Sequence, residues 1–491
     1  MTSEMIEITK IIQDGASSAM SLEEIIKTEI NSWLESPTRQ WMIIGERYYR
    51  TKPDILERQR MVIGDDGKPV KVDNLSNNRL ANGFIRKLVD QKVGYLLGKA
   101  MSIQAKPDAY QEVLNDIFNE DTLRQLQSIG KEAVKKGIAW LHIFYDEAGA
   151  FCFKKMRSEE ILPFWRDDAH TELDAVARIY DVEAYLGATK TIISKVEWWD
   201  TTGVHRYVLE GDGLIPDVEA GEYSPHFFVS SAQKEEPLGW GRVPFVAWKY
   251  NEEEQPLVEI IKTLVDDYDR NKSDNSNNLE DLPNSIYVVE NYGGTDAGEF
   301  RRNISTYRVA FVHEDGDVRT LQLKIDTEAY KNHMEQTRKD IYEFGRGVDT
   351  QGVEIGSAPS GIALKFLYSD LDLDASLMET EFQASLKQLR WFIDTHLYNS
   401  TGADYSGENV SFVFNRDMPI DEQAIIAAIK DSVGILSDET LVAQHPWVKN
   451  VKAELDRIKK EKDAAIEQAQ HYGGLGGGDP HANKSSVPPS Q

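Results

Sequence analysis

The sequence predicts an α+β protein built from several parts, and three observations support this. Apolar residues recur every three or four positions between residues 22 and 98, which is the spacing of amphipathic helices. From about Ile138 to Tyr250 the period changes to two, which is typical of β-strands. Two long helical segments then flank a short insert at residues 283–326 that has the pattern of strands. The expected architecture is an α+β body with a helical stalk that ends in a small knob.

The bulk composition is that of a folded protein. The chain has 491 residues, 41% hydrophobic and 10% aromatic, enough for about two to four domains with packed cores. No apolar run approaches the roughly 20 residues that span a bilayer, so no membrane partner is expected. Residues 1–15 are acidic and lack a basic segment, so a signal peptide is not expected. Cys152 is the only cysteine, which excludes an internal disulfide and favours assembly in a reducing cytoplasm.

The net charge narrows the class of nucleic-acid partner. Acidic residues number 82 against 55 basic ones, which gives a formal charge of −27. Proteins that read a DNA sequence obtain much of their affinity from Lys and Arg on phosphates. The balance therefore argues against a sequence-reading protein, but it is compatible with one that lets DNA pass without holding it.

The first 250 residues divide into a helical part and a β-rich part. Helices are expected at residues 22–34, with Ser21 as the N-cap, and from Asn78 to Gly98. Between them, Gly64-Asp-Asp-Gly67 predicts a turn that joins short extended pieces. Four short strands separated by Gly, Asp and Pro are expected at Ile138–Tyr145, Ala175–Tyr180, Thr191–Trp198 and Val204–Leu209.

The first stalk helix is expected after Pro256, which follows three glutamates that favour a helix N-terminus. Six apolar residues then keep helical spacing, namely Leu257, Ile260, Ile261, Leu264, Val265 and Tyr268. From Asp269 to Asp281 the chain is polar on every side. We therefore expect one end of this helix to be packed and the other to lie in water.

The knob and the second stalk helix follow. The knob is expected to contain strands at Ser285–Val289 and Tyr307–Val312, a short helix capped by Asp296, and a hairpin turn at Asp315-Gly316. The second helix is then expected to end at the glycine pair 345 and 347. Its apolar face consists of Tyr330, Met334, Thr337, Ile341 and Phe344.

The last third of the chain is mostly helical. Asp349–Gly361 is a loop rich in Gly, Ser and Pro, and a long helix is expected from Ile362 to about Tyr398. The elements expected after it are a strand at Asn409–Asn415 and helices at Asp421–Leu436, Ser437–Gln444 and Asn450–Gln470. Residues 471–491 are a low-complexity tail without core-forming residues.

No catalytic or cofactor motif is complete. Gly356 and Gly361 imitate the frame of a P-loop, but Ile362 and Ala363 stand where Lys and Ser or Thr are needed. Asp370, Asp372, Asp374 and Glu381 match four positions of a calcium loop, but Ala375 replaces the glycine that such a loop needs. A solvated or ion-paired helix face is the favoured interpretation of these carboxylates, with a two-metal nuclease as the alternative. No cofactor and no metal are therefore expected.

Three segments are the most distinctive in the chain. They are NNRLANGFIRKLVDQKVGYLLGK (77–99), GWGRVPFVAWKYNEEEQPLVEIIKTLVDDYDRNKSDN (239–275) and APSGIALKFLYSDLDLDASLMETEF (358–382). In their order and spacing they resemble the portal proteins of long-tailed phages of Gram-positive bacteria. The resemblance covers about Glu46 to Gln470 and includes no catalytic motif.

The resemblance implies a portal fold whose parts carry the names used for that family. These are a wing (1–253), a stem helix (254–281), a clip (282–326), a second stem helix (327–347), a tunnel loop (348–361), a long tunnel helix with a wing strand (362–416), and a helical crown (417–470). Residues 471–491 lie outside the similarity and are expected to be a disordered tail.

The resemblance also implies a function. It predicts a ring of twelve subunits at one capsid vertex, a conduit for packaging and ejection of double-stranded DNA rather than an enzyme. The implied partners are copies of the chain itself, the terminase large subunit, a head-completion or tail adaptor protein, and the major capsid and scaffolding proteins. The implied location is the virion, after assembly in the host cytoplasm. A metal-dependent phage nuclease that uses Asp370, Asp372 and Asp374, and a scaffold without a DNA role, are the alternatives.

Two groups of site residues follow from this interpretation. The residues of the tunnel loop expected to face DNA are Asp349, Gly352, Val353, Glu354, Ile355 and Gly356. The stem residues expected to contact neighbouring subunits are Leu257, Ile260, Ile261, Leu264, Tyr268, Met334, Ile341 and Phe344. Their apolar faces are too long for one small domain to cover. An acidic channel wall would let DNA slide, because a wall that bound phosphates would retain it.

Overall fold

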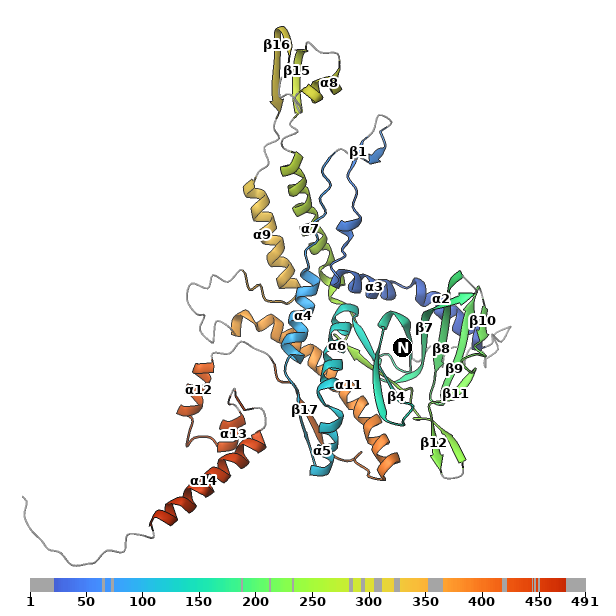
Figure 1. Cartoon of the computed structure of the whole chain (residues 1–491), viewed down its shortest axis with the longest axis vertical. Helices are drawn as coiled ribbons and strands as arrows, with labels where there is room; N and C mark the ends of the chain where they lie inside the picture. The colour runs from blue at the N-terminus through green and yellow to red at the C-terminus, as the bar shows by residue number, and fades with distance from the viewer. Residues whose placement is uncertain are drawn as a thin grey trace, which may run out of the picture. The chain divides into compact units, whose positions relative to one another are not determined.

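A computed structural model describes residues 22–63, 67–71, 75–186, 189–211, 213–231, 234–281, 286–292, 296–303, 311–321, 327–351, 365–416, 422–443, 445, 447–448 and 451–473. The chain forms two compact units, one of residues 1–354 and 367–417 and the other of residues 355–366 and 418–491. The first unit combines helices with several sheets, and the second contains helices (Figure 1). The predicted α+β class is confirmed.

The helices of the first unit begin and end where the sequence provides capping residues. Ser36 accepts a hydrogen bond from the Arg39 amide in front of α3, and Asn119 accepts from two amides in front of α6. The helices are α2 (Leu22–Glu35), α3 (Pro37–Tyr49), η1 (Asp54–Glu57), α4 (Phe84–Leu97), α5 (Asp108–Ile117), α6 (Glu120–Lys136), η2 (Ser158–Glu160), α7 (Leu257–Asp281), α8 (Ala297–Arg302), α9 (Thr327–Phe344) and α11 (Ser369–Thr401). The second unit contains α12 (Glu422–Asp431), α13 (Asp438–Ala443) and α14 (Val451–Gly473).

Antiparallel strands form the body of the first unit. The largest sheet has the order β10-β9-β8-β7-β6, with β11 also paired to β9. Its strands are β6 (Ile161–Trp165), β7 (Leu173–Leu186), β8 (Thr189–Trp199), β9 (Gly203–Glu210), β10 (Gly213–Pro216) and β11 (Tyr223–Pro225). A three-stranded sheet has the order β14-β4-β5, formed by β4 (Ile138–Tyr145), β5 (Phe151–Met156) and β14 (Phe245–Lys249). The four strands predicted in this region are confirmed.

Four two-stranded sheets complete the first unit. They are β1 (Met61–Ile63) with β2 (Pro69–Lys71), β12 (Phe227–Ser231) with β13 (Lys234–Leu238), β15 (Ile286–Tyr292) with β16 (Val312–Leu321), and β17 (Val410–Val413) with β3 (Ser102–Ala105). The last pair fixes the chain after α11 to the segment after α4, more than 300 positions away in sequence.

One hydrophobic core joins helix α2 to the sheets. Ile26 and Ile30 of α2 are fully buried in the same cluster as Trp140, Phe164 and Trp198 from β4, β6 and β8. Helix α11 lies along β14: the Phe382 ring meets Trp248 edge-on, and the Ser385 hydroxyl donates to the carbonyl of residue 247. Burial of these side chains stabilises the body, which serves as the base of the two long helices.

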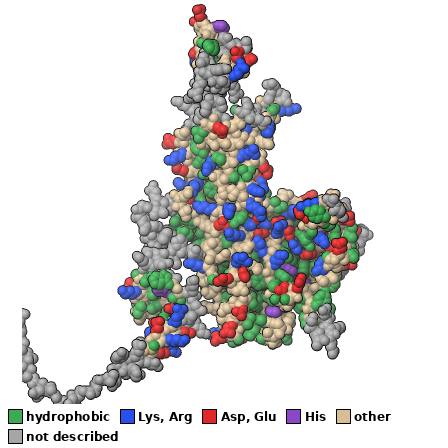
Figure 2. All heavy atoms as spheres, in the orientation of Figure 1, with side chains coloured by type: hydrophobic (Ala, Val, Ile, Leu, Met, Phe, Trp, Pro, Cys, Tyr) green, Lys and Arg blue, Asp and Glu red, His purple; other side chains and the backbone are tan. Residues whose placement is uncertain are grey.

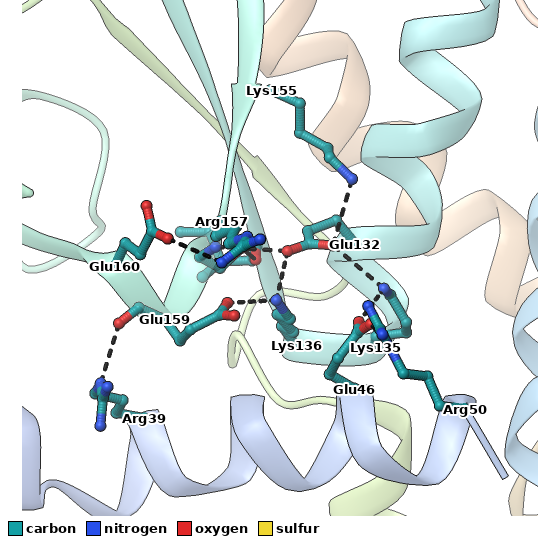
Figure 3. A network of polar contacts seen from close by, with 12 residues as sticks. Arg39, Glu46, Arg50, Glu132, Lys135, Lys136, Lys155, Arg157, Glu159 and Glu160 are labelled. Atoms are coloured by element: carbon teal, nitrogen blue, oxygen red, sulfur yellow. Dashed lines mark hydrogen bonds and ion pairs between the residues drawn. The ribbon is translucent and has the colours of Figure 1, made fainter. Parts of the chain in front are cut away.

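A buried charge network ties α6 to α3 and η2 (Figure 3). Lys136 is 2% exposed and lies between the carboxylates of Glu132, 2.6 Å away, and Glu159. Lys135 contacts Glu46 of α3, and Lys155 of β5 lies 3.6 Å from Glu132. Burial raises the pKa of Glu132, but the lysines lower it more, and the result is about 2. The network is therefore ionised at neutral pH.

Two local predictions are wrong. Helix α4 begins at Phe84, and residues 75–83 lie outside any helix or strand, so the helix predicted from Asn78 starts six residues later. Asp315-Gly316 is not a hairpin turn, because β16 runs through it from Val312 to Leu321. Asp315 and the opposite Asn291 both have positive φ, at 65° and 51°, where the strand register shifts. The Asp-Gly pair therefore lies in an irregularity of the hairpin, where residues 313–316 of β16 oppose the single residue 291 of β15.

Other local predictions are confirmed or cannot be compared. Asp296 caps α8 by accepting from the Glu299 amide, as predicted. The helices predicted near 421–436, 437–444 and 450–470 correspond to α12, α13 and α14, although α12 ends at Asp431. Ser21, Tyr307 and residues 474–491 of the tail lie outside the described residues.

Candidate functional site: the stem helices and their anchors

The apolar face of α7 is covered by the chain's own body. Leu257, Ile261 and Val265 are at most 1% exposed and face α3, α4 and α6. Farther along, the Tyr268 ring packs edge-on against Phe84 of α4, with centroids 4.9 Å apart. The first half of α7 is thus fixed in the body.

The polar half of α7 is buried by an extended segment. Asp269, Ser273 and Asn277 are spaced four residues apart and are 0%, 0% and 4% exposed. They accept hydrogen bonds from the backbone amides of residues 82, 80 and 78, at 3.1, 2.9 and 2.6 Å. The prediction that this half of the helix lies in water is wrong for the face that carries these three residues, whereas residues 278–280 at its end are exposed. The side-chain oxygens of these residues thus accept the backbone hydrogen bonds that carbonyl groups of a neighbouring strand would accept in a sheet.

The ladder formed by Asp269, Ser273 and Asn277 contains one unfavourable group. Burial raises the pKa of Asp269 to about 6, against the lowering effect of hydrogen bonds from the side chain and backbone of Asn82. The Oδ2 atom of Asp269 is buried without a hydrogen-bond partner among the described residues. Ionisation of this carboxyl group therefore costs free energy in the folded state.

Helix α9 lies beside α7 (Figure 1). His333 of α9 lies 2.9 Å from the Asp267 carboxylate of α7. At the base of the pair, the Phe84 ring contacts both Tyr268 of α7 and Tyr342 of α9. Phe84 is therefore a common packing point for the two helices, and their spacing is set by α4.

The segment after α9 is fastened to α4. The Gln91 side-chain amide donates to the Val348 carbonyl at 3.1 Å and accepts from the Val348 amide at 2.9 Å. Arg338 donates two hydrogen bonds to the Asp349 carboxylate, at 2.6 and 2.8 Å. These bonds lower the pKa of Asp349, so the carboxylate stays charged and paired. The chain therefore leaves α9 from a fixed position.

A buried ion pair connects α4, α9 and α11. The Lys92 ammonium, 2% exposed, donates to the Asp374 carboxylate at 2.8 Å and to the Arg346 carbonyl at 3.2 Å. The Tyr250 hydroxyl lies 3.0 Å from both oxygens of Asp374. Burial lowers the pKa of Lys92, and the carboxylate beside it opposes this effect. Lys92 thus fixes the turn after α9 to the first turns of α11.

The start of α11 is fastened to α4 as well. The Tyr95 hydroxyl donates to Asp372 at 2.8 Å, and Arg416 bridges Asp372 and Glu379. Gln91, Lys92 and Tyr95 lie within five consecutive residues of α4 and hold the two ends of the chain segment between α9 and α11. Helix α4 is therefore the platform from which this segment starts and to which it returns.

The predicted carboxylate cluster is committed to these structural contacts. Asp374 is paired with Lys92 and Asp372 with Arg416, while Asp370 is exposed. Burial raises the pKa of Glu381, farther along α11. Within the described part of the chain, no three His, Cys, Asp or Glu residues converge as a metal site. The ion-paired interpretation is confirmed for Asp372 and Asp374, and the nuclease alternative loses two of its three ligands.

Comparison with known proteins identifies the family. The family model described as "Phage portal protein, SPP1 Gp6-like" matches residues 38–468. The chain belongs to this portal protein family. The portal protein of Bacillus phage SPP1 is 29% identical over 465 residues, which cover 94% of this chain and 91% of that protein. The portal protein of Clostridium phage phiCD119 is 30% identical over 457 residues, which cover 89% and 96%.

A solved structure was also matched, a chain from the neck of a native GTA particle computed with C12 symmetry. It is 12% identical, has a TM-score of 0.39, and the match covers 75% of this chain and 91% of that one. Family membership makes the chain a structural component of a bacteriophage virion, at the connection between head and tail.

The structure divides the stem residues predicted to contact other portal subunits into two groups. Leu257, Ile261, Tyr268 and Ile341 are between 0% and 9% exposed within the single chain. These four side chains are covered largely within the single chain, and their contact with neighbouring subunits stays a prediction. The four others stay accessible: Leu264 and Met334 are half-buried, Ile260 is 41% exposed and Phe344 is 58% exposed.

The predicted tunnel loop is only partly described. Asp349 is part of its fixed base, bound to Arg338. Gly352, Val353, Glu354, Ile355 and Gly356 lie outside the described residues, as does the P-loop-like Gly361. Their contact with DNA stays a prediction.

Sequence reasoning missed the anchoring residues. Gln91, Lys92 and the ladder on α7 have no motif around them, because their partners are more than 180 positions away. One signal was present. Asp269, Ser273 and Asn277 repeat every fourth residue in a helix without Gly or Pro, which indicates a polar stripe that a neighbour can cover.

The surface of the stem and body carries both signs of charge. Figure 2 shows acidic and basic side chains interspersed over the face in view. Among the described helices, none is long and apolar enough to cross a membrane.

Proposed function

We propose that this portal protein assembles into a ring of twelve copies around an axial channel through which double-stranded DNA enters and leaves the capsid. The observation that supports this best is the double anchoring of the segment between α9 and α11 on Gln91, Lys92 and Tyr95 of α4. A loop that starts and ends on one rigid helix can reach into a channel while its base stays in place. Repetition by a ring would present such loops around a common axis.

The charge of the chain suits a conduit. At −27 per copy, the ring as a whole repels the DNA phosphates, and a duplex can advance without long retention. The tunnel loop residues Gly352, Val353, Glu354, Ile355 and Gly356 would then touch DNA by van der Waals contact. No covalent chemistry is part of this role, and the portal is not an enzyme.

The partners follow from the position in the virion. The clip, which includes β15, α8 and β16, is the docking element for the terminase large subunit during packaging and for the head-completion or tail adaptor protein afterwards. The wing meets the major capsid and scaffolding proteins during assembly in the host cytoplasm. Further copies of the chain bind through the stem, where Ile260, Leu264, Met334 and Phe344 remain accessible.

Ring formation is tested by mass photometry of the purified chain. Twelve copies of 55.7 kDa give a particle of about 670 kDa. Phe344→Asp places a charge on the accessible stem residue and is expected to yield smaller species. Ile192→Asp, on the equally exposed Ile192 of β8, is the matched control. A monomeric wild-type chain, or unchanged rings in Phe344→Asp, would contradict the proposed assembly.

The conduit is tested by packaging in vitro with terminase and proheads. Replacement of Gly352 and Gly356 together by proline restricts the backbone of the loop without adding charge. We expect normal rings, continued ATP hydrolysis by terminase and sharply reduced packaging. Val353→Lys is expected to slow packaging more at low salt than at high salt. Wild-type packaging by both variants at all salt concentrations would show that the loop does not contact DNA.

A further inference from the structure

Asn82 and Gly83 form the one Asn-Gly pair of the 491-residue sequence. They join the segment bonded to α7 to Phe84, the first residue of α4, and Gly83 is exposed. In such a pair the backbone nitrogen of the glycine can attack the side-chain amide carbon of the asparagine, because glycine has no side chain to screen it. Ammonia leaves and a succinimide ring forms, which water then opens to aspartate or isoaspartate. Asn82 therefore has the local sequence that favours deamidation most.

Hydrogen bonds restrain both the side chain and the backbone of Asn82. Its Nδ2 atom donates to the Asp269 carboxylate at 2.7 Å, and its backbone amide donates to the same oxygen at 3.1 Å. Its Oδ1 atom accepts from the Lys272 ammonium at 2.8 Å, and its carbonyl accepts from the Phe84 amide at 2.9 Å. Formation of the succinimide rearranges this side chain together with the peptide bond to Gly83, and the Nδ2 atom has to leave. The bonds to α7 therefore oppose the reaction as long as the segment stays in place.

The products of this reaction do not fit the same site. Aspartate at position 82 lacks the Nδ2 donor and places a carboxylate against Asp269, which is 0% exposed and whose Oδ2 atom has no hydrogen-bond partner among the described residues. Like charges in a buried site repel each other strongly, and the Lys272 ammonium then has two carboxylates to compensate instead of one. Isoaspartate instead adds one carbon to the main chain between the ladder and α4. Either product therefore weakens the attachment of the segment to α7.

We propose that Asn82 is a deamidation site which the ladder on α7 protects, and whose modification prevents residues 78–83 from returning to α7. A chain reacts only while this segment is detached, with water as the co-reactant, and afterwards the segment stays open. Phe84 follows directly and packs against both Tyr268 and Tyr342, so a detached segment also loosens the packing point shared by α7 and α9. The site thus distinguishes chains with an intact stem base from chains that have opened. The inference concerns the single chain and does not rest on the proposed ring.

Protection is tested by peptide mapping with mass spectrometry after incubation of the full chain at mildly alkaline pH. We expect Asn82 to deamidate at least about tenfold more slowly in the folded chain than in the same chain unfolded in urea, because detachment of the segment limits the reaction. Gly83→Ala should suppress the reaction in both states, and its Cβ would meet Thr51 Oγ1 at 3.4 Å, an ordinary contact that the fold tolerates. Equal rates in the folded and unfolded wild type, or no reaction in the unfolded chain, would overturn the proposal.

A variant of the ladder shows whether α7 provides the protection. Ser273→Ala removes the acceptor of the amide of residue 80. Loss of this hydrogen bond should raise the detached fraction, and with it the rate of deamidation at Asn82, about fivefold. Ser432→Ala is the matched control, because both serine hydroxyls donate to the carbonyl four residues earlier at 2.7 Å, but Ser432 lies outside the ladder. A rate in Ser273→Ala no higher than in Ser432→Ala would contradict protection by the ladder and overturn the proposal.

The effect of the modification is tested with Asn82→Asp, which reproduces one of the two products. We expect the amides of residues 78 and 80 to exchange hydrogen at least about tenfold faster than in wild type, while the amides of β4 exchange as in wild type. Asn332→Asp, at an exposed position of α9, adds the same charge and is the control. Exchange in Asn82→Asp no faster than in Asn332→Asp would show that the modified segment still binds α7, which would overturn the proposal.

Discussion

Replacement of Lys92 by methionine is the most direct test of the anchor between α4 and α11. The variant keeps a long apolar side chain, so the volume of the site changes little. It removes the ammonium group that donates to Asp374 and to the Arg346 carbonyl. The Asp374 carboxylate, 7% exposed, then stays buried without its principal partner.

The expected cost is near the lower end for a broken buried ion pair. Removal of one partner from such a pair typically costs about 3–5 kcal/mol. Asp374 keeps the Tyr250 hydroxyl at 3.0 Å, and the Arg346 guanidinium lies 3.8 Å away, so part of its charge remains compensated. We therefore expect about 3 kcal/mol, which corresponds to roughly 100-fold in the equilibrium for local opening.

Hydrogen exchange followed by mass spectrometry measures this opening where it occurs. The amides of residues 345–348 are bonded to carbonyls of α9 or to Gln91, and we expect them to exchange roughly 100-fold faster in Lys92→Met. Lys131→Met is the control. Lys131 also pairs with α4, at Asp90, but both side chains are about 40% exposed. An exposed pair contributes about 1 kcal/mol at most, or a change of up to roughly fivefold.

The double variant Lys92→Met/Asp374→Asn completes the test. It leaves neither charge buried alone, so its destabilisation should be smaller than the sum of the two single effects by about 1 kcal/mol or more. Strict additivity, or exchange in Lys92→Met no faster than in Lys131→Met, would refute the view that this pair holds the segment after α9.

Three further predictions concern buried polar groups. The pKa of Asp269 is about 6 against an ordinary 3.8, so the free energy of unfolding falls as pH rises through this interval. The melting temperature of Asp269→Asn relative to that of wild type should therefore increase between pH 4 and 6, and the difference should stay constant above pH 6. The pKa of Glu132, about 2 against 4.5, has the opposite sign, so the deficit of Glu132→Gln, about 3 kcal/mol at pH 7, should shrink as pH falls below 4.5. Asn277→Leu leaves the Asn78 amide unbonded and should cost about 1–3 kcal/mol, detected as faster exchange at residue 78 than in wild type.

The long helices could be predicted from sequence because the spacing of their apolar side chains shows which face of each helix is buried. The apolar stripe of Leu257 to Tyr268 located α7, and the pattern from Tyr330 to Phe344 located α9, since most residues of each stripe are buried or half-buried. In β8 the alternating residues Val196 and Trp198 face the hydrophobic core in the same way, whereas β4 is buried on both faces from Ile138 to Ile143.

The partners of the polar residues could not be predicted in this way. Residues 78–83 have a helical pattern locally, yet the amides of residues 78, 80 and 82 bond to α7, nearly 200 positions later, and that contact favours a non-helical backbone. Likewise, nothing near Lys92 indicates that Asp374 lies beside it. The ion-paired character of the acidic residues on α11 was predictable from the missing glycine of a calcium loop, but the identity of the cations was not.

The ladder on α7 also limits which changes in chain length the protein tolerates. Two residues of extended chain advance about 6.6 Å and four residues of helix about 6.0 Å. Because these two repeats are nearly equal, every second backbone amide can bond to every fourth side chain of the helix, but only over a few successive hydrogen bonds. A point substitution at residue 79 or 81 leaves the three hydrogen bonds between the segment and α7 intact. Deletion of one residue there would displace the amides that follow by about 3.3 Å, beyond hydrogen-bond reach. Related portals with this ladder should therefore vary in composition at these positions, but not in length.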